Sequence, residues 1–203
     1  GSSSADADGD GIADCVDPCP EWPHDCSEDG QTITVAMGQS IAAAVEVVPD
    51  GGAVSILPGT YVETVDVAGK AITVMGPGPS GSVVIDGEGV RRGVVVARGE
   101  TAATRYENLV FRNGVNQLDV DIDGNGTLNW WEFEGAGGYV YESSPTFVSC
   151  RFESNVSTSS GGGMYIYGAS SSPSFIECIF WQNSAVASGG GVTSYRSSAT
   201  FVD

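Results

Sequence analysis

The amino-acid sequence predicts an all-β chain, a parallel β-helix or solenoid that begins with one short helix. Three observations lead to this prediction: an internal repeat in the last third, short β-rich segments between Gly and Pro turns, and an unusual composition. Among 203 residues there are 29 glycines, and only 17% of the residues are charged. Many glycines with few charges indicate tight turns and short strands. The apolar residues, 41% of the chain, are enough for one sizeable core.

The first predicted element is a helix over residues 39–48, where an apolar helical stripe ends at Pro49-Asp50-Gly51-Gly52. Short β-rich runs between turn residues follow it, at 53–57, 61–67, 71–75, 82–86, 93–97 and 105–111. We therefore expect the scaffold to occupy residues 31–203, after a separate leader at residues 1–30.

The last third of the sequence repeats with a period of 28 residues. The matching pairs are Pro145 and Pro173, Phe147 and Phe175, Cys150 and Cys178, Phe152 and Phe180, Asn155 and Asn183, and Gly161 and Gly189. This period, with Gly-Gly-Gly corners, indicates one turn of a parallel β-helix that buries its surface against its neighbours. Strand alternation puts Cys150 and Cys178 on the core face, so we expect stacked core residues rather than nucleophiles or metal ligands. A disulfide between them stays an open alternative because adjacent strands are close enough for a bridge, although the parallel directions of the two side chains argue against it.

The first half carries a series of motifs in a distinctive order. They are Ser40-Ile41-x-x-Ala44, Pro49-Asp50-Gly51-Gly52, Ile56-Leu57-Pro58-Gly59-Thr60-Tyr61-x-Glu63, Ile72-Thr73-Val74-x-Gly76 and Val84-Ile85-Asp86-Gly87. This order resembles the opening segment of the pectin-lyase-like family of right-handed parallel β-helices. The later pattern Phe-x-x-Asn followed by Gly-Gly-Gly-Met/Val resembles the repeats of polymorphic outer membrane proteins. The resemblance implies a right-handed solenoid whose short helix caps the first turn and protects its strand edges.

The net charge of −18 is concentrated in two short segments. Residues 1–30 hold nine acids and no Lys or Arg, and residues 119–134 hold five more acids without a basic residue. Concentrated carboxylates repel one another unless a cation neutralises them. This distribution argues against nucleic acid as a partner and predicts a divalent metal ion, Ca²⁺.

The first acidic segment has the ligand spacing of a calcium loop, with acids at positions 1, 3, 5, 9 and 12 and a Gly at position 6. With its trailing Asp17-Pro18-Cys19-Pro20 it resembles a thrombospondin type 3 repeat. The resemblance implies calcium ligands at Asp6, Asp8, Asp10, Asp14 and Asp17 and at the carbonyl oxygen of Ile12. A solvated acidic linker is the alternative interpretation. One disulfide is expected among Cys15, Cys19 and Cys26, with its pairing open.

The second acidic segment, residues 121–132, matches a complete EF-hand loop in its spacing. The candidate ligands are Asp121, Asp123, Asn125, Thr127, Asn129 and Glu132, with Gly126 at position 6. An EF-hand has a helix on each side, whereas residues 114–120 allow barely one turn. We therefore expect a lone calcium loop inserted at one corner of the solenoid, within residues 115–135, rather than a sensor pair.

A carbohydrate-active enzyme is the main alternative to a structural module, because related folds support both. The only candidates close together in sequence are Asp86 and Glu88 with Arg91, Arg92 and Arg98. We interpret them as a solvated corner, so no catalytic residue is predicted. A cleft with converging carboxylates and a basic residue on a strand face would favour the enzyme. A smooth solenoid with subunit contacts at its ends would favour the structural role.

Two further surfaces are candidates for contacts with partners. Trp130 and Trp131 could form a sugar-stacking or protein-binding patch, although packing of the loop against the solenoid is the commoner outcome. The segment Thr200-Phe201-Val202-Asp203 matches Ser174-Phe175-Ile176-Glu177 and stops inside a strand. We expect this last turn to be covered by further chain or by another subunit.

These observations together predict a calcium-binding structural or adhesion module without catalytic activity. The sequence has no apolar run of the ~18 residues that a membrane span needs, and its start lacks the features of a secretory signal. We expect an extracellular or cell-surface location, no membrane insertion, and self-association or a surface glycan or protein as partner.

Overall fold

The computed structural model describes residues 30–116, 121–122 and 126–203. The leader ligands Asp6, Asp8, Asp10, Ile12, Asp14 and Asp17 and the cysteines Cys15, Cys19 and Cys26 lie outside this part of the chain. The loop residues Asp123 and Asn125 lie outside it as well.

The described chain is mostly β, with short strands and a single α-helix, α1 (Ile41–Val47). The strands are β1 (Thr32–Val35), β2 (Ala53–Ile56), β3 (Gly59–Tyr61), β4 (Val65–Asp66), β5 (Thr73–Met75), β6 (Val83–Asp86), β7 (Val94–Val96), β8 (Arg105–Glu107), β9 (Val110–Arg112), β10 (Gly138–Tyr141), β11 (Thr146–Val148), β12 (Arg151–Glu153), β13 (Val156–Ser157), β14 (Met164–Tyr167), β15 (Ser174–Ile176), β16 (Ile179–Trp181), β17 (Ser184–Ala185), β18 (Val192–Tyr195) and β19 (Thr200–Val202). A 3₁₀ helix, η1 (Trp130–Phe133), precedes β10. In the described part of the chain, no helix is long and apolar enough to cross a membrane.

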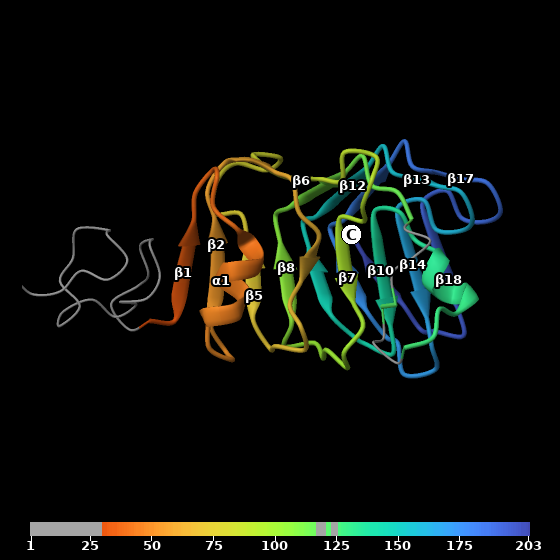
Figure 1. Cartoon of the computed structure of the whole chain (residues 1–203), viewed down its shortest axis with the longest axis horizontal. Helices are drawn as coiled ribbons and strands as arrows, with labels where there is room; N and C mark the ends of the chain where they lie inside the picture. Colours follow the sequence, from red (N-terminus) through yellow and green to blue (C-terminus); the bar gives the residue numbers. More distant parts are fainter. Residues whose placement is uncertain (1–29, 117–120, 123–125) are drawn as a thin grey trace, which may run out of the picture.

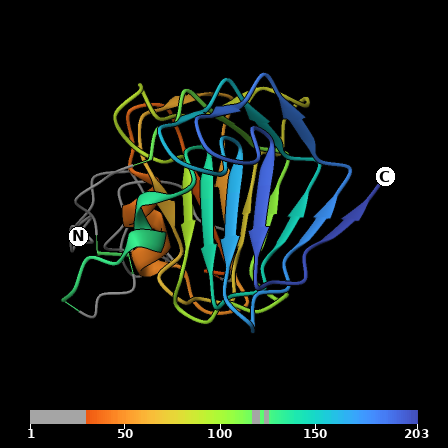
Figure 2. The ribbon, with the colours of Figure 1, turned by 90° about the vertical axis from the view of Figure 1, so that its right-hand side faces the viewer.

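The strands form three larger sheets, and the described neighbours pair in parallel. Sheet A has the order β1-β2-β5-β8-β11-β15-β19, sheet B β16-β12-β9-β6-β3 and sheet C β18-β14-β10-β7-β4. From β2 onward the chain visits sheets A, B and C in the same order in each turn, and the turns follow one another along the long axis of the molecule (Figure 1). Figure 2 brings the later strands, in blue, to the front. The all-β parallel arrangement is consistent with a β-helix-like fold.

The 28-residue repeat predicted from the sequence corresponds to stacked positions on neighbouring strands. Phe147 pairs in register with Phe175, and Phe152 pairs with Phe180. The ring centroids in both pairs are 5.0 Å apart, and the rings are nearly parallel. Stacking like residues in neighbouring turns lets each apolar side chain bury its faces against the next turn.

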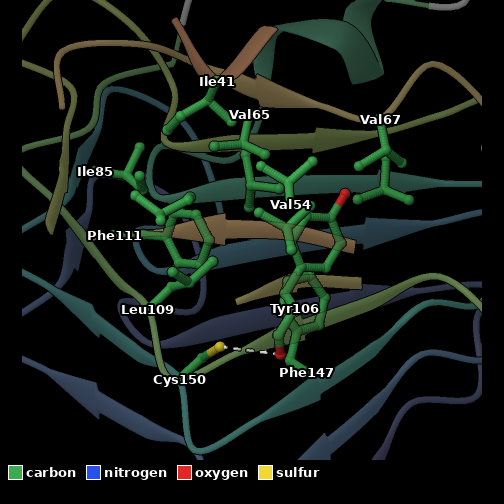
Figure 3. Packing of buried hydrophobic residues seen from close by; sticks show 14 of the residues in the cluster. Ile41, Val54, Val65, Val67, Ile85, Tyr106, Leu109, Phe111, Phe147 and Cys150 are labelled. Carbon is green, nitrogen blue, oxygen red and sulfur yellow. Dashed lines mark hydrogen bonds between the residues drawn. The ribbon is translucent and has the colours of Figure 1, made fainter. Parts of the chain in front are cut away.

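The core lies between the three sheets and contains the predicted apolar ranks. Tyr106, Phe111, Phe147 and the thiol of Cys150 gather there, as Figure 3 shows. The Cys150 Sγ donates a hydrogen bond to the Tyr106 carbonyl at 3.3 Å. Cys178 packs against the same cluster in a half-buried position. The prediction that both thiols are core residues is confirmed.

Two predicted β runs are each divided into two strands. The run 105–111 contains β8 and β9, which are separated at Asn108, where φ is +54°. The run 61–67 likewise covers the end of β3 and all of β4. The corner between sheets A and B recurs at Ser149 and Glu177, with φ values of +50° and +52°. Asn adopts a positive φ more often than most residues other than Gly, but the β-rich pattern of residues 105–111 alone does not show that the strand ends at Asn108.

A second kind of corner explains why Asn recurs in the repeat. The Asn155 Oδ1 accepts a hydrogen bond from Gly114 N at 2.7 Å, and its Nδ2 donates to the Phe111 carbonyl at 3.1 Å. In the next turn the Asn183 Oδ1 accepts from Asn155 N at 3.0 Å. The side chain of each Asn therefore satisfies backbone groups that the corner removes from the sheets.

Helix α1 covers one end of the core and is held from the following turn. It buries Ile41, Ala44 and Val45, and the Ser40 Oγ accepts from Ala43 N as an N-cap. At the same end the Glu63 carboxylate accepts from the backbone N–H groups of residues 41 and 42 at 3.0 and 3.1 Å. At the other end the Lys70 Nζ donates to the carbonyls of Val45, Glu46 and Val48 at 2.7, 2.7 and 2.9 Å. Both ends of the helix thus have side-chain partners for backbone groups left free by the helix.

Candidate metal-binding loop and neighbouring surfaces

The predicted calcium loop lies between β9 and β10, and the structure describes part of it. Of the candidate ligands, Asp121, Thr127, Asn129 and Glu132 are described. The described residues contain no α-helix on either side of the loop, and the 3₁₀ helix η1 includes its last residues. Among the described residues the loop thus lacks the flanking α-helices of a helix–loop–helix unit, while residues 117–120 lie outside the described part.

Two carboxylates at the ends of the loop accept hydrogen bonds from its own backbone. The Asp121 Oδ2 accepts from Gly126 N at 2.6 Å. The Glu132 Oε1 accepts from Ile122 N, and its Oε2 accepts from Asn129 N, both at 2.6 Å. Glu132 is only 1% exposed, and Gly126 has a φ of +81°, which favours Gly. The first and last acids of the motif are thus oriented by the loop backbone rather than directed into solvent.

This donor set fits a hard divalent cation in its chemistry. Carboxylate, amide and carbonyl oxygens are the ligands that Ca²⁺ takes, and the described candidates offer only oxygen side-chain donors or an amide. Within residues 30–116, 121–122 and 126–203, no three Asp, Glu, His or Cys side chains come together as a metal-binding group. A third acid of the motif, Asp123, lies outside those ranges.

The loop packs on the outer face of sheet C through a second hydrophobic cluster. Ile122, Tyr139 and Tyr165 are buried in this cluster, and Trp131 packs against them. The expectation that the loop packs against the β scaffold is confirmed for Trp131. Trp130 differs, because 55% of it is exposed. Figure 1 shows η1 in green beside β14 and β18.

An aromatic surface continues from the loop along sheet C; we define it as Trp130, Trp131, Tyr141, Tyr167 and Tyr195. The three tyrosines stack as a ladder with centroid separations of 5.7 and 5.8 Å. Trp131 lies 5.4 Å from Tyr167, and Trp130 lies 6.2 Å from Tyr195. The tyrosine rings cover one another's faces, so the exposed part of this surface consists mainly of Trp130 and the last ring, Tyr195.

The prediction that Asp86 and Arg92 belong to a solvated corner is wrong. Asp86 is 8% exposed, and its Oδ2 accepts from Arg112 Nε at 2.9 Å. Burial raises the pKa of Asp86, but hydrogen bonds from Glu88 N, Arg112 and Asn113 outweigh it and lower the pKa below its usual value. The Asp86 carboxylate therefore has a structural role within sheet B. Glu88 and Arg98 are exposed, as expected for a corner.

Arg92 is fully buried and contacts the end of the inserted loop. Its Nε donates to the carbonyls of Glu134 and Gly135 at 3.1 and 2.9 Å, and its Nη2 donates to Glu134 O at 2.9 Å and to Glu132 O. The guanidinium carbon lies 5.6 Å from the centroid of the Tyr139 ring. Sequence reasoning missed this role; the one available signal was that Arg92 shares the alternation of the buried Val94 and Val96.

A polar groove lies over sheet B, with a volume of about 380 Å³. Its walls include Arg112, Arg151, Glu153 and Glu177, with Val110 and Ile179 as apolar parts. Arg151 Nε lies 2.5 Å from the Glu153 carboxylate. Carboxylates and basic side chains therefore converge over a strand face, which is the feature expected of the enzyme class. Its lining does not include Glu88, Arg91 or Arg98, which sequence proximity had suggested.

No protein-family model, curated protein or solved structure matches this chain. The functional argument therefore depends on the residues and their geometry.

Proposed function

We propose that the chain is an extracellular or cell-surface right-handed parallel β-helix that binds Ca²⁺ and serves as a structural or adhesion module without catalytic activity. The proposal includes two calcium sites, one in the leader at residues 1–30 and one in the loop at residues 121–132. The resemblance to pectin-lyase-like and polymorphic outer membrane protein repeats supports the handedness and the surface location. The leader site is supported by its sequence spacing.

The orientation of Asp121 and Glu132 is the observation that carries the calcium proposal. Both carboxylates turn toward the loop backbone, where Gly126, Ile122 and Asn129 donate to them. Prior orientation reduces the conformational entropy that ligands lose when they bind an ion. A bound Ca²⁺ would supply positive charge that relieves the repulsion among the carboxylates of this segment.

Titration calorimetry of the full chain tests the loop site. We expect two Ca²⁺ ions per wild-type chain and one per Glu132→Gln chain, with an unchanged β-type circular dichroism spectrum because the loop lies outside the repeat. Glu46→Gln is a matched control, since Glu46 is exposed on α1. Equal stoichiometry in wild type and Glu132→Gln would show that the loop binds no calcium.

Self-association through the last turn belongs to the same proposal, with coverage by further chain as the alternative. Phe201 is 54% exposed and stacks 5.0 Å from Phe175, so one face of the ladder has no further ring on it among the described residues. Ile179 and Trp181 are each 52% exposed nearby in the last turn of sheet B. An exposed strand edge with apolar side chains is a template for pairing with another chain.

Light scattering with and without a chelator tests the assembly. The leader has nine carboxylates and no Lys or Arg, so without bound calcium its negative charge would repel a partner. We therefore expect chelation to lower the assembly state. Phe201→Ser should lower it in the presence of calcium as well. A monomer that is indifferent to both changes would refute self-association.

A carbohydrate-active enzyme is a second candidate, favoured by the groove over sheet B. Its test is cleavage of a panel of polysaccharides by wild type and by Glu153→Gln, followed through new reducing ends and unsaturated products. We expect no cleavage by either protein. Cleavage by wild type that is lost in Glu153→Gln would establish the enzyme and overturn the non-catalytic proposal.

A further inference from the structure

Arg92 occupies an unusual position, because a fully buried cation contacts the backbone of a peripheral loop. A buried guanidinium is strongly destabilising unless its donors and its charge are satisfied. Here three carbonyls accept from it, at Glu132, Glu134 and Gly135. Glu132 belongs to the last turn of η1, Glu134 is its C-cap and Gly135 follows directly, where helix geometry leaves C=O groups without intrahelical donors. Arg92 therefore caps the short helix that closes the loop.

An aromatic ring also lies against the Arg92 guanidinium. The face of the Tyr139 ring adds a cation–π contact, with the guanidinium carbon 5.6 Å from the ring centroid. Hydrogen bonds from a charged donor are stronger than neutral ones, so the loop end has a firm attachment to the scaffold.

Glu132 is the residue that links this attachment to the candidate metal site. Arg92 binds its carbonyl, while its carboxylate accepts from Ile122 N and Asn129 N. The next acid, Glu134, extends in the other direction, and its carboxylate accepts from Ser159 Oγ at 2.9 Å and Ser160 N at 2.5 Å. The closing end of the loop is thus held both by the turn before it and by the turn after it.

We infer that Arg92 is a positioning residue for the calcium loop, whose buried guanidinium fixes the carbonyls of η1 and thereby the Glu132 carboxylate and the Trp131 ring. The metal-binding part of this inference rests on the proposed function. Groups that orient metal ligands from outside the ligand sphere typically change affinity by about 10–100-fold when they are removed.

The test compares Arg92→Met with Arg91→Met in the full chain. Methionine keeps an unbranched apolar stem but has no donors, and Arg91 is a matched control that donates from a more exposed position to the Val62 carbonyl at 2.8 Å. We expect Arg92→Met to weaken Ca²⁺ binding at the loop by about 10–100-fold, with an unchanged β-type circular dichroism spectrum. Arg91→Met should bind as wild type does. Arg92→Lys keeps the charge with fewer directed donors, so we expect an intermediate affinity.

A second measurement needs no metal and separates this inference from the calcium proposal. In chelator, Arg92→Met should release the loop from sheet C, which limited proteolysis detects as new cleavage between residues 113 and 135 and fluorescence detects as a red-shifted tryptophan emission. If wild type binds no calcium at the loop but Arg92→Met is cleaved and red-shifted, the calcium proposal fails and the positioning role stands. If Arg92→Met matches Arg91→Met in cleavage, emission and affinity, the positioning role is wrong. If Arg92→Met unfolds globally, the same comparison is made between Arg92→Lys and Arg91→Met.

Discussion

Replacement of Lys70 by Met should destabilise the end of the core that α1 covers. The Lys70 ammonium group donates to three carbonyls at the end of α1, and the helix dipole adds a favourable interaction with the positive charge. Each hydrogen bond from a charged group contributes at least ~1.5 kcal/mol to stability. Lys70 is half-buried, so water competes for its ammonium group and the three bonds together contribute less than their sum. We therefore expect Lys70→Met to lower the free energy of unfolding by about 2 kcal/mol.

Thermal unfolding followed by circular dichroism measures this effect. A loss of about 2 kcal/mol corresponds to a fall in melting temperature of about 4–8 °C for a chain of this size. Arg98→Met is the matched control, because Arg98 is 55% exposed in its side chain and lies 3.4 Å from Asp66. Such an exposed ion pair is worth about 0–1 kcal/mol. Equal melting temperatures for the two variants would refute the idea that Lys70 holds α1 on the core.

Three further predictions concern the core and the titrating groups. Phe147→Ala should cost about 3–5 kcal/mol of unfolding free energy because the ring is fully buried, whereas Phe201→Ala should cost less than about 1 kcal/mol in the monomer; urea denaturation measures both, and equal losses would contradict the assigned burial. The pKa of Asp86 is lowered in the folded state, so its carboxylate stabilises the fold above the unfolded pKa, and this contribution disappears as pH falls through the folded pKa. The melting temperature should therefore fall more steeply in acid for wild type than for Asp86→Asn. Parallel curves for the two proteins would contradict the lowered pKa. Burial raises the pKa of Tyr165 to about 12, so alkaline absorbance titration of wild type minus Tyr165→Phe should show one phenol that ionises well above the usual range; a normal phenol would contradict its burial.

The regular part of the scaffold could be predicted because apolar residues recur at a fixed distance. Phe147 and Phe175 are 28 residues apart and are stacked in register, so the repeat was visible without any structure. The corners were less visible. Asn108 and Glu177 adopt positive φ values, and the sequence pattern did not mark the corners between sheets A and B at these residues.

The long-range contacts of polar side chains were the least predictable. Lys70 caps a helix that ends more than 20 residues earlier, and Arg92 binds carbonyls about 40 residues later. Neither contact has a local signature, because the stacking of turns brings these residues together. The spacing of the loop predicts Asp121 and Glu132 as calcium ligands, and in the structure both carboxylates accept hydrogen bonds from backbone N–H groups of the loop.

The position of the inserted loop has a consequence for how the molecule unfolds. In a stack of repeats each turn contacts only its neighbours, so the ends can open independently of the middle. The aromatic surface is an exception, because it connects turns that are not neighbours. Trp131 packs on Tyr141 of β10, and Trp130 packs on Tyr195 of β18, two turns further along. We expect amides in β10, β14 and β18 to exchange with solvent as one cooperative block when the loop is docked, and turn by turn in Arg92→Met.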